Sequence, residues 1–96
     1  MVNEFQKNII INTIMPFHPV QIGIFGSVAR GENTENSDID ILYRLKDTVG
    51  LLNLVRIKDS LEKKLNKKVD LVSEKYIHPK LKHHIMSDLT IIYSNE

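Results

Sequence analysis

The sequence predicts an α/β or α+β fold in which helices pack against a single β-sheet. Segments with the spacing of amphipathic helices alternate with short apolar segments typical of strands. The chain has 96 residues, enough for one modest core that buries about two-thirds of the unfolded surface. We therefore expect a single domain over residues 1–96.

The composition is that of an ordinary globular protein. The formal net charge is +1, so nothing in it calls for a nucleic acid or an anionic membrane as partner. The absence of cysteine excludes disulfides and thiolate metal sites and fits a reducing compartment. No signal peptide and no bilayer-spanning apolar run are apparent. We expect a soluble cytoplasmic domain that binds neither membrane nor nucleic acid.

The first half of the chain predicts a helix, a strand and a short helical turn. Residues 3–15 place apolar side chains near helical spacing and end before a proline. Residues 20–25 form an apolar strand that Gly26 stops. Ser27 is expected to cap a short helix that continues to Arg30.

After a polar loop over residues 31–37, the pattern predicts three more strands and two more helices. The strands are expected at 38–45, 68–73 and 90–93, and the helices at 51–66 and 78–88. The helix over 51–66 carries an apolar stripe expected to face the core, made of Leu51, Leu54, Val55, Leu61 and Leu65.

Asp38 and Asp40 are the first candidates for chemistry. Residues at i and i+2 of a strand point to the same face, so the two carboxylates can converge on a cation. Ligands that are all oxygen favour Mg²⁺ or Mn²⁺. Taken alone, such a pair is more often a turn end followed by a solvent-facing residue.

The residues just upstream favour the metal interpretation. Gly26 lets backbone approach a ligand closely, and Ser27 adds a hydroxyl at the start of a helix, where N–H groups suit phosphate oxygens. Arg30 supplies a fixed positive charge with a geometry suited to phosphate. Together they form an anion cradle beside a dicarboxylate pair, as a nucleoside triphosphate with its metal requires.

Asp70 is the candidate for a third carboxylate, because a charge inside an apolar strand needs a reason. Glu74 is a weaker substitute, and the simpler alternative is that Asp70 alternates outward into solvent. In a two-metal site the ions lie about 3.5–4 Å apart and stabilise the attacking and leaving oxygens. Asp70 would then bind the second metal or accept the acceptor's proton.

The run Gly26-Ser27-Val28-Ala29-Arg30-Gly31, followed by Ser37-Asp38-Ile39-Asp40, resembles the signature of the DNA polymerase β-type nucleotidyltransferases. It is most similar to their stand-alone minimal members. The resemblance covers nearly the whole chain and implies a small mixed sheet flanked by helices.

The resemblance also implies site roles. Two Mg²⁺ ions, or Mn²⁺, would be held by the three catalytic carboxylates, Asp38, Asp40 and Asp70. The triphosphate would be bound by Gly26, Ser27 and Arg30, and Ser37 would help to orient the carboxylate loop.

Small members of this family are commonly encoded beside a helical HEPN-type ribonuclease toxin and act as antitoxins. The resemblance therefore implies transfer of AMP from ATP, or NMP from another NTP, to a hydroxyl of such a toxin. The chain has no separate acceptor-binding domain, so a partner or a homo-oligomer would supply that surface. Two alternatives stay open: a non-catalytic module that binds a toxin, and a transferase that acts on a small molecule such as an aminoglycoside.

Overall fold

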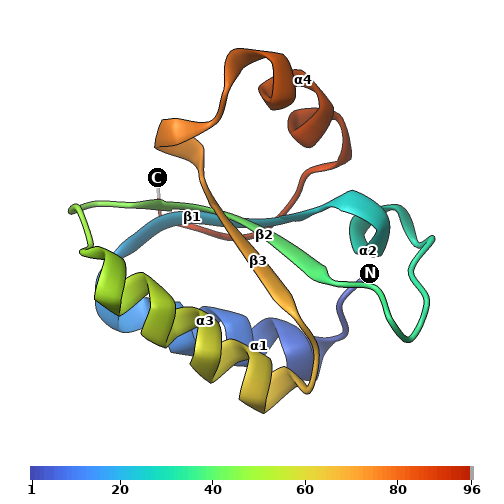
Figure 1. Ribbon diagram of the computed structural model, residues 1–96, viewed down its shortest axis with the longest axis horizontal. Coiled ribbons are helices and arrows are strands. Elements are labelled where there is room, and N and C mark those ends of the chain that lie inside the picture. Colours follow the sequence, from blue (N-terminus) through green and yellow to red (C-terminus); the bar gives the residue numbers. More distant parts are fainter. Residues whose placement is uncertain (96) are drawn as a thin grey trace.

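The computed structural model describes residues 1–95, whose helices and strands alternate along the chain (Figure 1). Helices α1 to α4 span Glu4–Ile14, Gly26–Arg30, Leu51–Leu65 and Pro79–Asp88. Strands β1 to β4 span Pro19–Phe25, Ile39–Leu45, Val69–Ser73 and Thr90–Ser94. Two 3₁₀ turns, η1 and η2, cover Met15–Phe17 and Glu74–Tyr76. Every predicted helix and strand is confirmed, with ends that differ by one residue at most.

The strands form one mixed sheet in the order β3-β2-β1-β4. β1 runs antiparallel to both of its neighbours, whereas β2 and β3 are parallel. Parallel strands need a long crossover connection, which α3 supplies here. The prediction of a small mixed sheet flanked by helices is confirmed.

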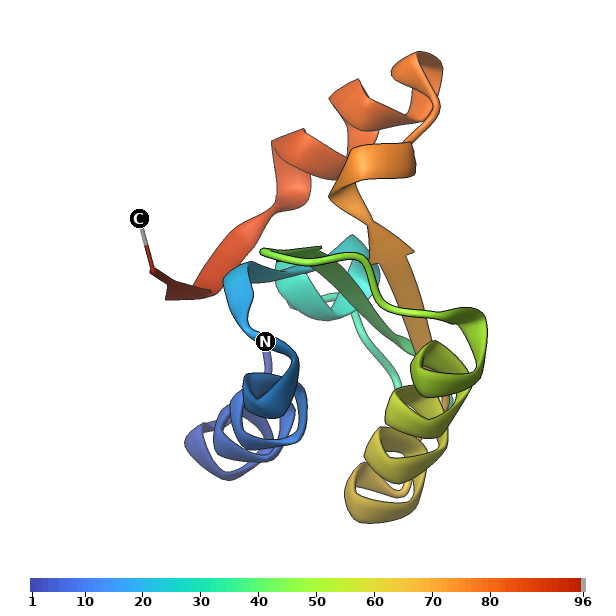
Figure 2. The same ribbon diagram turned by 90° about the vertical axis from the view of Figure 1, so that its left-hand side faces the viewer.

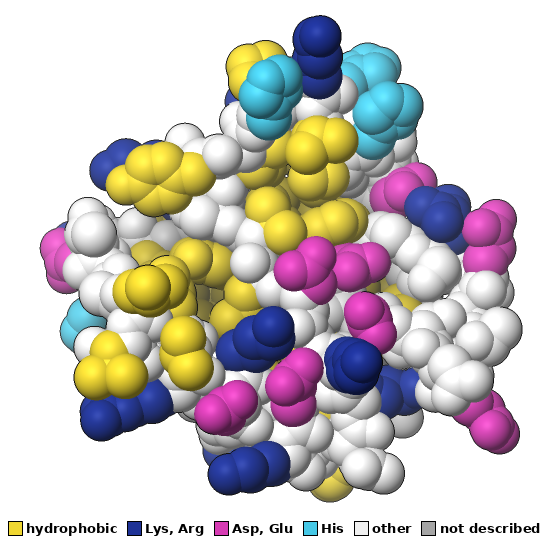
Figure 3. All heavy atoms as spheres, in the orientation of Figure 1, with side chains coloured by type: hydrophobic (Ala, Val, Ile, Leu, Met, Phe, Trp, Pro, Cys, Tyr) yellow, Lys and Arg dark blue, Asp and Glu magenta, His cyan; other side chains and the backbone are white. Residues whose placement is uncertain are grey.

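The helices lie on both faces of this sheet. α1 and α3 lie side by side on one face, and α4 rises from the other (Figures 1 and 2). α4 has no buried residue, and its surface carries histidine, basic and apolar side chains (Figure 3). Within residues 1–95, no helix is both long and apolar enough to cross a membrane.

Local sequence features set the helix ends. Asn3 and Gln6 form a capping box at the start of α1, in which each side chain accepts a hydrogen bond from the other's backbone N–H. α3 ends at Asn66, which adopts a left-handed conformation with φ 54°.

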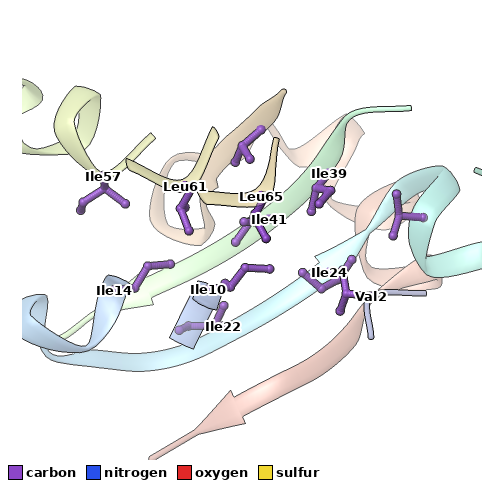
Figure 4. Close-up of a cluster of buried hydrophobic side chains, with 12 residues drawn as sticks. Val2, Ile10, Ile14, Ile22, Ile24, Ile39, Ile41, Ile57, Leu61 and Leu65 are labelled. Atoms are coloured by element: carbon purple, nitrogen blue, oxygen red, sulfur yellow. The ribbon is translucent and has the colours of Figure 1, made fainter. Parts of the chain in front are cut away.

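The core lies between the sheet and the α1–α3 pair (Figure 4). It is built almost entirely from isoleucine, leucine and valine. Its fully buried members are Ile10 and Ile14 of α1, Ile22 and Ile24 of β1, Ile39 and Ile41 of β2, and Leu61 of α3.

The predicted stripe of α3 was partly wrong. Leu51 is 78% exposed and Val55 is 47% exposed, whereas Ile57, absent from the prediction, is 4% exposed. The residues of α3 that contact the core are Leu54, Ile57, Leu61 and Leu65, which lie on one side of the helix. Val55 follows Leu54 by one residue, and so its side chain is turned away from Leu54 by about 100° around the helix axis. The buried residues of α3 begin only at Ile57, so Leu51 in the first turn does not reach the core.

Candidate active site

Asp40 and Asp70 lie side by side on the parallel strands β2 and β3. They are Cα partners in the register of these strands. Alternation along each strand turns Ile39 and Val69 toward the core, which places both aspartates on the opposite face, the one from which α4 rises. Asp38 is exposed and directly precedes β2. The fold therefore gathers the three predicted carboxylates at the amino-terminal ends of two neighbouring strands.

These carboxylates repel one another. Burial raises the pKa of the Asp40 carboxyl above its ordinary value, and the charges of Asp70 and then Asp38 raise it further. The charge of Arg30 acts in the opposite direction but is the smallest of the four effects. A half-buried carboxylate among like charges is stabilised by a nearby cation.

Gly26 is packed directly against Asp40. Phe25 is the register partner of Asp40, so Gly26 leaves the sheet beside that carboxylate. Gly26 has φ +75°, and a Cβ atom at this position would collide with a carboxylate oxygen of Asp40. Glycine is therefore needed here both for its backbone conformation and for the space it leaves.

The role predicted for Ser27 as a helix cap was wrong. α2 begins at Gly26, its N-cap residue is Phe25, and no side chain caps it. The positive φ of Gly26 turns the chain from strand to helix one residue earlier than the pattern suggested. Ser27 therefore lies inside α2, one residue after the glycine that packs on Asp40.

Arg30 already has two carboxylate partners. Its guanidinium donates a hydrogen bond of 3.0 Å to Glu32 and one of 2.6 Å to Asp88 at the end of α4. These hydrogen bonds raise the pKa of Arg30, that to Glu32 most. Sequence reasoning missed both partners. The partner role of Asp88 could have been predicted in part from the sequence. An acidic residue at a helix C-terminus interacts unfavourably with the helix dipole, and a contact with a cation compensates for this.

Ser37 shapes the loop that leads to Asp38. Its hydroxyl accepts a 2.8 Å hydrogen bond from the backbone N–H of Thr34, which closes a turn just before the carboxylates. This position suits the predicted orienting role, which stays a prediction.

The chemistry of Asp38, Asp40 and Asp70 suits a hard divalent cation, because all three side chains offer carboxylate oxygens and none offers nitrogen or sulfur. In the described chain, residues 1–95, no three His, Cys, Asp or Glu side chains are already close enough to hold a metal ion. The strand register fixes Asp40 beside Asp70, whereas the side chains of Asp38 and Asp70 are exposed and have room to rotate. The residues present fit such an ion, provided that those two side chains turn inward.

Comparison with known proteins identifies the family to which the chain belongs. A family model described as "Polymerase beta, Nucleotidyltransferase" matches residues 7–96. A Methanocaldococcus jannaschii protein, named as a candidate protein adenylyltransferase, is 44% identical over 88 residues, which cover 91% of this chain and 92% of that protein.

Solved structures show the same fold. A toxin–antitoxin complex with AMP-PNP contains a chain that is 25% identical, with a TM-score of 0.84 over 94% of this chain and 74% of that one. A candidate minimal nucleotidyltransferase is 33% identical, with a TM-score of 0.76 over 88% of this chain and 87% of that one. The fold is that of the polymerase β-type nucleotidyltransferases, and the chain belongs to that enzyme family.

Proposed function

We propose that this chain transfers AMP from ATP to a hydroxyl group of a partner protein, in a reaction that depends on Mg²⁺. The observation that carries the proposal is the register of Asp40 with Asp70, with Gly26 packed on the Asp40 carboxylate. A relative 44% identical to this chain is named as a candidate protein adenylyltransferase, which supports AMP as the transferred group.

The chemistry of the transfer assigns a role to each carboxylate. The acceptor oxygen forms a bond to the α-phosphorus of ATP, and the bond from that phosphorus to the bridging oxygen breaks, so that pyrophosphate leaves with the electron pair. Bound Mg²⁺ would neutralise the phosphate oxygens and polarise the reacting phosphorus. Asp38 and Asp40 would hold the ion and the nucleotide together. Asp70 would hold a second ion or accept the proton of the acceptor hydroxyl.

The phosphate side of the site would be Gly26, Ser27 and Arg30. Gly26 allows the chain to pass close to Asp40 without a side chain in the way. A triphosphate there would compete with Asp88 and Glu32 for the Arg30 guanidinium, whose fork geometry suits phosphate as well as carboxylate.

The proposed acceptor is a helical HEPN-type toxin, for which this chain would act as the antitoxin. The support is a structural neighbour that is part of a toxin–antitoxin complex with AMP-PNP, together with the family resemblance of the motif. Because the reaction consumes ATP, we place the protein in the cytoplasm, acting as a single domain.

The test is transfer of label from α-³²P-ATP to a HEPN-type protein. Asp40→Asn and Asp70→Asn should each reduce labelling by about a hundredfold or more, since a carboxylate that acts in the transition state contributes on this scale. Asp59→Asn, which removes an exposed carboxylate of α3 outside the candidate site, serves as the control for the loss of a negative charge. Labelling by Asp40→Asn at the wild-type rate would refute the proposal.

The same variants distinguish transfer from simple binding. If Asp40→Asn still neutralises the toxin in cells while labelling is lost, the protein acts as a binding module. Labelling of an aminoglycoside but not of the protein would instead place it among the small-molecule transferases.

A further inference from the structure

A cleft of about 410 Å³ opens at the far end of the strands that carry the carboxylates. It lies between the carboxyl ends of β2 and β3, the loop before α3, the turn η2 and Lys82 of α4. Asp40 is near the amino end of β2 and Leu45 is at its carboxyl end, about 16 Å away at 3.3 Å per residue. Of the residues considered for the site, only Glu74, the weaker substitute for the third carboxylate, lines this cleft.

The charge of the cleft is unbalanced. Four basic side chains line it and only two acidic ones, and the chain as a whole carries a net charge of only +1. One of the acids, Glu74, lies 3.4 Å from Arg44 and so already faces a cation. Three lysines, Lys46, Lys75 and Lys82, contribute the remaining positive charge. The cleft therefore suits a negatively charged occupant.

The wall of the cleft is also apolar. Leu54 and Val49 line it, and the first turn of α3 continues the apolar surface outward: Leu51 is 78% exposed and Leu52 is 64% exposed. On the other side Tyr76 is 72% exposed. Figure 3 shows apolar side chains around a hollow on this side of the molecule, near the start of α3. Exposed apolar side chains gathered around a cleft mark a site of protein interaction, and tyrosine is enriched among the residues that dominate binding at such sites.

We propose that this cleft docks an acidic, amphipathic segment of the acceptor protein, which holds the acceptor while its hydroxyl reaches the carboxylates. The segment places acidic side chains against Lys46, Lys75 and Lys82, and apolar side chains against Leu52 and Tyr76. This inference rests on the proposed function for the nature of the partner. The surface itself follows from the charge and exposure of the cleft.

Other occupants fit these observations less well. An RNA strand would use the lysines and stack on Tyr76, but it would leave the leucines of α3 exposed. A second copy of the chain would bring two basic clefts together in a symmetric contact, and like charges would oppose it.

The experiment measures binding of a HEPN-type protein by calorimetry, separately from AMP transfer. The double variant Lys46→Glu/Lys75→Glu should weaken binding at least tenfold, and Leu52→Ser should weaken it severalfold. The control Lys63→Glu/Lys64→Glu makes the same change of charge on exposed residues at the other end of α3 and should bind as the wild type does. Thermal melts of all variants establish that they fold.

Two outcomes would overturn the docking proposal. The first is unchanged binding by the cleft variants. The second is a combined result: the lysine variant loses binding to a 20-nucleotide single-stranded RNA, and Leu52→Ser does not change the binding of the protein. That result would assign the cleft to RNA.

Asp40→Asn separates this inference from the proposed function, because it should lose transfer yet bind the HEPN-type protein with wild-type affinity. Cleft-dependent binding without any transfer by the wild type would refute the proposed function and leave the docking site standing.

Discussion

Arg30 of α2 donates a 2.6 Å hydrogen bond to Asp88, the last residue of α4. This ion pair links the helix beside the carboxylates to a helix with no buried residue of its own. Because Arg30 is also a predicted phosphate ligand, a bound triphosphate would compete with Asp88 for the same guanidinium.

Asp88→Asn should therefore strengthen the binding of ATP with Mg²⁺ by a few-fold, since it removes a competing carboxylate from Arg30. The substitution should also lower Tm slightly, because α4 loses its ion pair with α2. Isothermal calorimetry and a thermal melt check the two effects, with Asp59→Asn as the control for loss of a negative charge. Weaker ATP binding in Asp88→Asn would mean that Asp88 positions Arg30 for the phosphate rather than competing for it.

Gly26→Ala should destabilise the fold and abolish transfer. Two effects contribute: a residue with a side chain is strained at φ +75°, and its Cβ atom would meet the Asp40 carboxylate. Gly31 has φ +74° with no atom within 4 Å of its Cβ position, so Gly31→Ala reports the backbone strain alone. We expect about 1 kcal/mol for Gly31→Ala and about 2–3 kcal/mol for Gly26→Ala from urea unfolding. Equal losses would show that the contact with Asp40 carries no cost.

Asp40→Asn should raise Tm at pH 7 even though we expect it to abolish transfer. The folded state raises the pKa of the Asp40 carboxyl above its usual 3.8. The free energy of unfolding therefore falls as the pH rises from the pKa of this carboxyl in the unfolded chain to its higher pKa in the folded protein. The gain in Tm should therefore shrink below about pH 4, where the wild-type carboxyl is protonated in both states. Melts of both proteins from pH 3.5 to 7.5 in EDTA check this, and a pH-independent difference would contradict it. Addition of Mg²⁺ should stabilise the wild type more than the variant.

Leu61→Ala should cost about 2–5 kcal/mol of folding free energy, because Leu61 is fully buried in the core. Leu51→Ala should change it by less than about 0.5 kcal/mol, because Leu51 is 78% exposed. Denaturant unfolding of the two variants compares the same substitution at two positions of one helix. A large loss for Leu51→Ala would restore the apolar stripe that the sequence suggested.

Much of the fold follows from local pattern. Apolar spacing, with the capping and chain-breaking residues, located every helix and strand, and strand alternation predicted that Asp38 and Asp40 point to the same face. What pattern alone left open was the pairing of β2 with β3, because residues distant in the chain determine it. The same limit applies to the Arg30–Asp88 pair, since neither residue predicts the other.

The errors have physical causes too. Leu51 is apolar but lies in the first turn of α3, before the part of the helix that packs on the core, and Val55 lies on a different side of the helix from Leu54 and Ile57. The residue types alone do not reveal either position. Ser27 had the residue type of a helix cap, but the backbone freedom of Gly26 moved the start of the helix. Roles in metal and nucleotide binding came from the residue types and their spacing together with the family resemblance, and they stay predictions.

The parallel pairing of β2 with β3 has a consequence for the order of events during synthesis. A nascent chain that has emerged only as far as β2 already contains Gly26, Arg30 and the first two carboxylates, yet Asp70 is still to be translated. The third carboxylate can join them only after α3, which connects β2 to β3, and the start of β3 have been synthesised. A ribosome-bound fragment that stops within α3 would therefore contain the proposed phosphate side of the site without Asp70 on its proposed acceptor side, and we expect such a fragment to lack transfer activity.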